Sequence, residues 1–221
     1  EGNFSEGRVS HFIDNLELGT TYYYRWLASN SVSSEAWSKP TEDGLIHWWN
    51  FDNIEGAKAF DRAGAFPATL ENLNEGNRVF SLFGKGIYFS GDNTQLIEVP
   101  GNKGISSNSD RTISFWIHTA DSSATLLDWG SDGIGKTWRV ELIDGKISLN
   151  FGGGVLLKTE QEINNSTWHH VVINFPTGST YATETIVYLD GIYMDKKGVI
   201  ITDLVVVMII QFIIFITLIL R

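Results

Sequence analysis

Cysteine is absent from the 221-residue chain, so its fold cannot depend on disulfide bonds. This absence does not exclude export from the cell, because a chain of this length can bury a core without such cross-links. Basic residues are scarce: 16 Lys and Arg stand against 26 Asp and Glu, and the net charge is −10. Nucleic-acid binding requires a basic surface that displaces counterions from phosphates, so the composition argues against a nucleic-acid partner.

The sequence also has no long segment with apolar residues at helical spacing. Short alternating runs take their place, and RTISFWIHT at residues 111–119 is the clearest. There Ile and Phe alternate with Thr, Ser and Trp, which is the period of a β-strand. Runs at 168–175 and 184–191 have a similar composition and are predicted partners. Because both faces of the 111–119 strand carry bulk, we expect it mid-sheet, with Trp116 and Trp168 in the core.

Seven short segments follow one another in a recognisable order: HWWNFD, DRAG, GKGIYFSG, RTISFWI, LLDWG, TWHHVV and VYLDG. Together they resemble the laminin-G-like, concanavalin A-like jelly-roll domain of secreted bacterial proteins, over residues 45–194. The resemblance implies an all-β fold with two packed antiparallel sheets in a sandwich. It also implies an extracellular or cell-surface multidomain protein. We assign residues 45–200 to this domain.

The first 40 residues are predicted to form a separate unit. Their alternating Tyr, Trp and Ala residues resemble the last three strands of a fibronectin type III sandwich, with Leu16 and Tyr22 at the tyrosine-corner positions. Leu18 and Ser33 depart from that pattern, which usually has Pro and Gly there. Three strands without a facing sheet would expose an apolar face, so we expect a fragment of a longer modular protein, with residues 41–44 as the linker.

Aspartates at the ends of predicted strands suggest a cation site. In the family that the chain resembles, a structural calcium is often bound by the Asp after the first strand, here Asp52, and by the loop that matches Gly91 and Asp92. Asp61 lies in the next turn and is a further candidate, because carboxylates from several loops suit calcium. The simpler alternative is that these residues cap turns. We therefore expect structural calcium as the cofactor or, failing that, a purely local role.

A ligand-binding site is predicted from Trp129, Arg139 and Glu141. Trp129 stands beside a Gly-rich loop and offers an aromatic platform, whereas Arg139 and Glu141 alternate with the apolar residues of strand 137–143 and should face solvent. Such a set suits carbohydrate hydroxyls. The alternatives are that Trp129 belongs to the core and that Arg139 and Glu141 only form a cross-strand charge pattern.

No catalytic site emerges from the sequence. Glu141 and Asp144 are near each other, but Asp144 belongs to the Asp-Gly turn and does not share a strand face with Glu141. His169 and His170 are adjacent on a strand and must point to opposite faces. We predict a noncatalytic binding or adhesion module whose ligand is carbohydrate or an extracellular protein. The alternatives are an accessory or degenerate domain of a glycoside hydrolase, and a structural spacer.

The tail, LVVVMIIQFIIFITLIL at residues 204–220, is nearly free of polar residues. Its length just reaches the minimum for a membrane-spanning helix, so residues 201–221 are predicted to be either a membrane anchor or an aberrant end. The family that the chain resembles usually ends with a closing strand that carries Gly and Ile-Asp-Asp. Nothing similar follows Met194, and we therefore expect the sheet to lack its closing strand.

Overall fold

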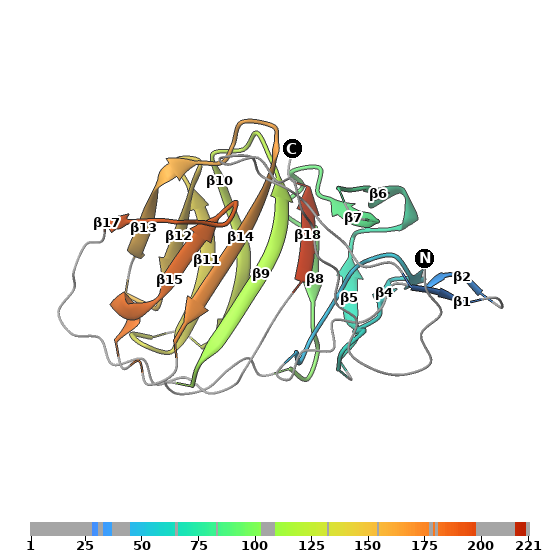
Figure 1. The fold of residues 1–221 in the computed structure, drawn as a ribbon, viewed down its shortest axis with the longest axis horizontal. Helices are drawn as coiled ribbons and strands as arrows, with labels where there is room; N and C mark the ends of the chain where they lie inside the picture. The colour runs from blue at the N-terminus through green and yellow to red at the C-terminus, as the bar shows by residue number, and fades with distance from the viewer. Residues whose placement is uncertain are drawn as a thin grey trace, which may run out of the picture. The chain divides into compact units, whose positions relative to one another are not determined.

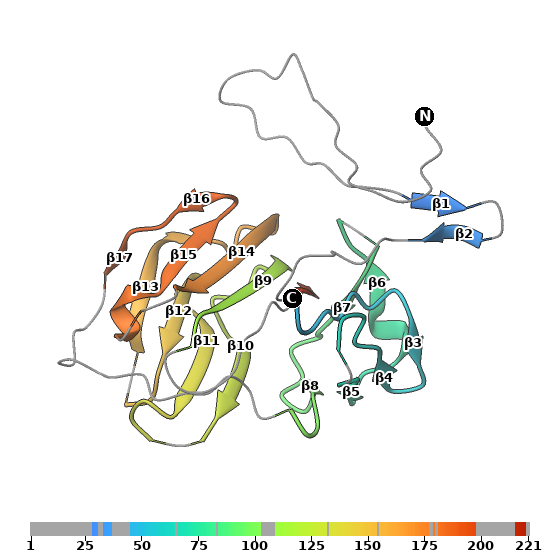
Figure 2. The ribbon, with the colours of Figure 1, turned by 60° about the horizontal axis from the view of Figure 1, so that its bottom comes forward.

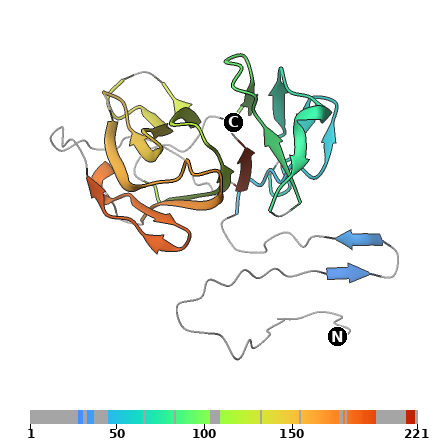
Figure 3. The ribbon, with the colours of Figure 1, turned by 90° about the horizontal axis from the view of Figure 1, so that it is seen from above.

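The computed structural model describes residues 28–30, 33–36, 45–64, 66–82, 84–102, 109–131, 133–153, 155–176, 179, 181–197 and 215–219. The chain divides into two compact units, Glu1–Ser38 and Lys39–Arg221. In the first unit, β1 (Ala28–Asn30) and β2 (Ser33–Ala36) form an antiparallel pair (Figure 3). Leu16 and Tyr22, on which the fibronectin type III assignment depends, lie outside the described residues.

The second unit contains a five-stranded sheet in the order β10-β11-β12-β13-β17. Asp144 and Gly145 connect β11 to β12 with positive φ angles of 52° and 73°, as the two-residue turn predicted from Asp-Gly requires. The strands are β10 (Ser123–Gly130), β11 (Thr137–Ile143), β12 (Lys146–Asn150), β13 (Val155–Glu162) and β17 (Lys196–Lys197).

A seven-stranded sheet has the order β16-β15-β14-β9-β18-β7-β6. β9 lies in its interior, as predicted, and pairs with β14 from Arg111 and Phe175 to His118 and Trp168. The strands are β6 (Arg78–Phe80), β7 (Lys85–Tyr88), β9 (Arg111–His118), β14 (Trp168–Phe175), β15 (Ile186–Leu189), β16 (Ile192–Tyr193) and β18 (Phe215–Ile219).

The two large sheets pack face to face as a jelly-roll sandwich (Figures 1 and 2). Every second residue of β9 points inward, and Phe115 is fully buried. From β11, Trp138 enters the same core with no exposed surface, and its ring meets Phe151 edge-on at 4.7 Å. This alternation leaves the other residues of each strand on two outward faces.

A third, smaller sheet has the order β3-β4-β5-β8 and buries Ala59, Ala68 and Leu70 in the common core. β3, β4, β5 and β8 pair antiparallel with their neighbours. Its strands are β3 (Ile54–Glu55), β4 (Lys58–Ala59), β5 (Ala68–Glu71) and β8 (Leu96–Glu98), and two short 3-10 helices, η1 (Glu75–Asn77) and η2 (Ala182–Glu184), complete the described elements.

The tail supplies a strand where none was expected. β18 lies between β9 and β7, pairs in parallel with both and joins them in one sheet, so the sequence-based expectation of a missing closing strand is wrong. The β-branched and aromatic residues of Phe215–Ile219 favour an extended conformation. Over the part of the chain that the structure describes, no helix is long and apolar enough to cross a membrane.

Candidate functional site

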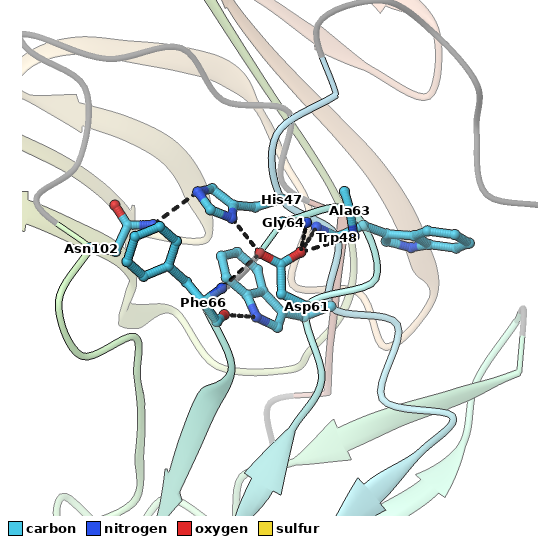
Figure 4. A network of polar contacts seen from close by, with 8 residues as sticks. His47, Trp48, Asp61, Ala63, Gly64, Phe66 and Asn102 are labelled. Carbon is cyan, nitrogen blue, oxygen red and sulfur yellow. Dashed lines mark hydrogen bonds and ion pairs between the residues drawn. The ribbon is translucent and has the colours of Figure 1, made fainter.

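Asp61 is the centre of a buried polar network (Figure 4). Its side chain has no exposed surface, and the His47 ring Nδ1 lies 2.5 Å from Oδ2. Oδ1 accepts hydrogen bonds from the backbone N–H groups of Trp48, Ala63 and Gly64 at 2.9–3.0 Å. Burial raises the pKa of Asp61, but the hydrogen bonds from His47 and these N–H groups outweigh it and lower the pKa to about 2.

The same network holds the HWWNFD and DRAG segments together. His47 Nε2 lies 3.1 Å from the Asn102 amide, and its ring stacks on Trp49 at 5.1 Å. At Gly64 a Cβ atom would lie 2.5 Å from the Ile46 carbonyl oxygen and 2.6 Å from the Asp61 carboxylate, so a side chain does not fit there. The arrangement therefore accounts for the DRAG glycine through packing.

The side chains of Asp52 and Asp92, the other predicted cation ligands, also accept hydrogen bonds within the protein. Asp52 accepts hydrogen bonds from the Lys85 N–H at 2.9 Å and from the Asn50 amide at 2.9 Å. Asp92 is exposed and accepts from the N–H and hydroxyl of Thr94, which lower its pKa. Among the described residues, no group of three His, Cys, Asp or Glu side chains could hold a metal ion. Calcium binding by Asp52, Asp61, Gly91 and Asp92 thus stays a prediction from the resemblance.

The predicted ligand residues do not share one surface. β10 and β11 pair Trp129 with Trp138, whereas Asp128 is opposite Arg139. Trp129 consequently lies on the core side, where its ring stacks on Trp138 at 5.8 Å and 5°. The structure places Arg139 and Glu141 on the outward face, as expected, but separates them from Trp129. This corrects the predicted grouping, and the core alternative describes Trp129.

The outward side of the five-stranded sheet forms what we call the polar face: Asp128, Arg139, Glu141, Ser148 and Asn150. Arg139 donates to the Asp128 carboxylate from Nε at 3.0 Å and from Nη2 at 2.8 Å. The Asn150 amide lies 3.5 Å from Glu141 Oε2. The Ser148 hydroxyl is buried and has no hydrogen-bond partner among the described residues. Donors and acceptors therefore stand side by side across three strands.

Asp128 and Asn150 were not predicted from the sequence as members of the candidate site, although the sequence contained a pattern that indicates the position of Asn150. A two-residue Asp-Gly turn pairs the residues on either side of it, which places Asn150 opposite Arg139. Asp128 had no such signal, because the register between β10 and β11 shifts between Thr125 and Leu127.

The outward side of the seven-stranded sheet forms what we call the aromatic face: Trp116, His118, Trp168, His170, Tyr188 and Tyr193. Trp116 stacks on His170 at 4.8 Å, His118 meets Trp168 at 5.4 Å, and Tyr188 meets Tyr193 at 6.2 Å. Trp116 and Trp168 are partly exposed here, so their predicted place in the core is wrong. The alternation of strand 111–118 already indicated the outward direction of Trp116, because Trp116 lies on the same side of the strand as the polar residues Thr112 and Ser114.

His169 and His170 point to opposite faces, as predicted. The buried His169 ring lies 2.7 Å from the Asp190 carboxylate and 2.9 Å from Asn165 Oδ1. On the outward face, His170 Nε2 is 2.8 Å from the Ser114 hydroxyl. Burial lowers the pKa of His170, and the nearby Asp190 offsets this in part, so its surroundings favour the neutral ring.

The Ser114–His170 contact resembles the nucleophile–base pair of a hydrolase, but its surroundings differ. Asp190 contacts His170 through the backbone N–H at 2.8 Å and binds the ring of His169 instead. It therefore does not orient the His170 imidazole as the acid of a catalytic triad would. Ser114 is moreover 5% exposed, which leaves a substrate little access.

Comparisons with known proteins give distant structural matches. No protein-family model matches the chain, and no curated protein sequence matches it. The binding domain of paraclostridial mosquitocidal protein 1 is similar, with 21% identity and a TM-score of 0.49, over 66% of this chain and 39% of that one. Domains LG4-5 of the mouse laminin α1 chain share 12% identity with a TM-score of 0.35, over 49% of this chain and 28% of that one. The chain thus spans well under half the length of either.

Proposed function

We propose that the chain is a noncatalytic binding module of an extracellular or cell-surface multidomain protein, with carbohydrate as its ligand. The observation that supports this most is the polar face, where the Arg139–Asp128 pair lies beside the partly exposed Glu141 and Asn150 side chains. Sugar hydroxyls both donate and accept hydrogen bonds, so such a mixed array suits them. The resemblance of residues 1–40 to fibronectin type III sequence supports a modular parent.

Binding of soluble polysaccharides to the full chain tests this proposal. We expect weak recognition, with dissociation constants from roughly micromolar to millimolar, as a few hydrogen bonds on an open surface provide. Arg139→Ala should weaken binding about fivefold, whereas Arg62→Ala, which removes the same charge from an exposed loop residue, should not. No binding by the parent chain to any polysaccharide would contradict the carbohydrate proposal and favour an extracellular protein ligand or a structural spacer.

The enzyme alternative has its own test. An accessory or degenerate domain of a glycoside hydrolase would be accompanied by hydrolysis of β-glucan in the full parent protein but not in this chain. Release of reducing sugar by the 221-residue chain itself, abolished by Glu141→Gln, would contradict the noncatalytic assignment.

A further inference from the structure

The aromatic face carries no acidic or basic charge on its strands. Among the described outward positions of β9, β14, β15 and β16, there is no Asp, Glu, Lys or Arg. The polar face on the other sheet contains Asp128, Arg139 and Glu141, and the whole chain carries a net charge of −10. A surface without Asp, Glu, Lys or Arg on so acidic a protein favours neutral ligands, because it offers ionic ligands no permanent charge to pair with.

The side chains of this face are amphipathic. Trp168 and Tyr188 are partly exposed and Tyr193 is 52% exposed, so ring surfaces and hydroxyl groups are both accessible. The Ser114 hydroxyl is 5% exposed and lies 2.8 Å from His170 Nε2 beside Trp116, so the tyrosine hydroxyls supply the hydrogen-bonding atoms of this face. Tyr and Trp side chains that expose both ring surfaces and polar atoms suit a ligand that has both apolar C–H surfaces and hydroxyl groups. A purely apolar partner would leave these polar atoms unsatisfied.

The extent of the face indicates a ligand longer than one sugar. Cross-strand pairing places Tyr193, Tyr188, Val172 and Ser114 in one row across four strands, and the His170–Trp116 pair lies at the next outward position along β14 and β9. Four strands at the usual spacing span roughly 14 Å. A chain of several sugar rings can therefore contact more than one aromatic residue at once.

We propose that the aromatic face is a second ligand surface and that it binds neutral polysaccharide. This inference rests on the proposed function for its ligand class and adds the surface, the neutrality of the ligand and a valency of two. The two faces lie on opposite outer sides of the sandwich, so one molecule can contact two polysaccharide chains (Figures 1 and 2). Linked contacts of this kind strengthen attachment to a surface that presents many chains.

The test compares variants of the full chain in binding to a neutral soluble β-glucan, measured by titration calorimetry. Tyr193→Ala and Trp168→Ala should each weaken binding at one of two sites about tenfold. Tyr181→Ala is the matched control, because Tyr181 is 43% exposed but lies outside the aromatic face, and it should bind as the parent does. Thermal melts verify that each variant is folded. If Trp168→Ala is unfolded, the result for Tyr193→Ala, a change at an exposed position, decides whether the aromatic face binds the polysaccharide.

The outcomes separate this inference from the proposed function. Unchanged binding in Tyr193→Ala together with weakened binding in Arg139→Ala would confine the ligand to the polar face and overturn the inference alone. The inference alone would also be overturned if the parent chain bound the polysaccharide at one site only and Arg139→Ala abolished that binding. A parent chain that binds no polysaccharide overturns both proposals.

Discussion

On the outward side of the five-stranded sheet Arg139 faces Asp128, whereas on the outward side of the seven-stranded sheet Trp116 faces His170. The inward sides do not differ in this way, since both bury aliphatic and aromatic residues such as Phe115 and Trp138. Core packing restricts the side-chain type of only every second residue in each strand. The alternate residues face outward, and their side chains can differ between the two sheets. One sandwich can therefore present two unrelated ligand surfaces.

The largest effect should come from a residue that supports both faces. Phe115→Ala removes a fully buried ring from the middle of β9 and should destabilise the fold by about 3–5 kcal/mol. Tyr193→Ala, on the exposed surface, should change stability by less than about 0.5 kcal/mol. Urea unfolding of the two variants measures this difference, and equal losses would contradict the assignment of inward and outward residues.

Calcium should stabilise the chain without affecting either face, if the predicted ligands Asp52, Asp61 and Asp92 bind it. At a hundredfold excess over its dissociation constant, calcium would add about 2.7 kcal/mol to the free energy of unfolding. Melting temperatures in calcium and in chelator test this, and superimposable curves would reject the site.

Asp61 should give the chain a sensitivity to acid that neither face explains. Its pKa is about 2 in the folded state against an ordinary value of 3.8, so its contribution is present above pH 4. As pH falls from about 4 to 2, roughly 2 kcal/mol of stability should be lost, because the unfolded chain takes up the proton first. Unfolding measured across this range should lose part of its pH slope in Asp61→Asn but not in the exposed control Glu98→Gln.

The smallest expected effect is that of salt on polysaccharide binding, and it should differ between the polar face and the aromatic face. Raising salt from 0.05 to 0.5 M should weaken polysaccharide binding by the polar face about twofold, because its charged groups are exposed and screened. Binding by the uncharged aromatic face should not change. Binding by the Tyr193→Ala variant reports the salt dependence of the polar face, and binding by Arg139→Ala reports that of the aromatic face. The same salt dependence in both variants would remove the distinction between the surfaces.

How far the sequence predicts this arrangement depends on how each pair of strands is connected. The Asp144-Gly145 turn determines which residues of β11 and β12 face each other, so the outward direction of Arg139 and Glu141 was predictable. The register of β10 was not, because a bulge changes which of its residues face Arg139. Trp129 was grouped with Arg139 and Glu141 only because it stands beside a Gly-rich loop, which does not indicate its side of the sheet.

Two further differences have separate causes. The burial of Trp116 and Trp168 was overestimated because tryptophan in a sandwich is usually in the core, although their strand positions indicated the outward side. The tail is a continuous apolar run, and such a run does not distinguish a spanning helix from a buried strand. Its parallel place between β9 and β7 depends on contacts distant in sequence.

The position of β18 has a consequence for the rate of folding. Phe215 pairs with Ser114 and Leu218 pairs with Ile87, so these contacts close loops of about 100 and 130 residues. The hairpins β11–β12 and β15–β16 need only two-residue turns. Contacts between distant residues form slowly, and we expect β18 to dock last. Until it does, β7 and β9 each have an unpaired edge, and we therefore expect the form without docked β18 to be the one most prone to aggregate.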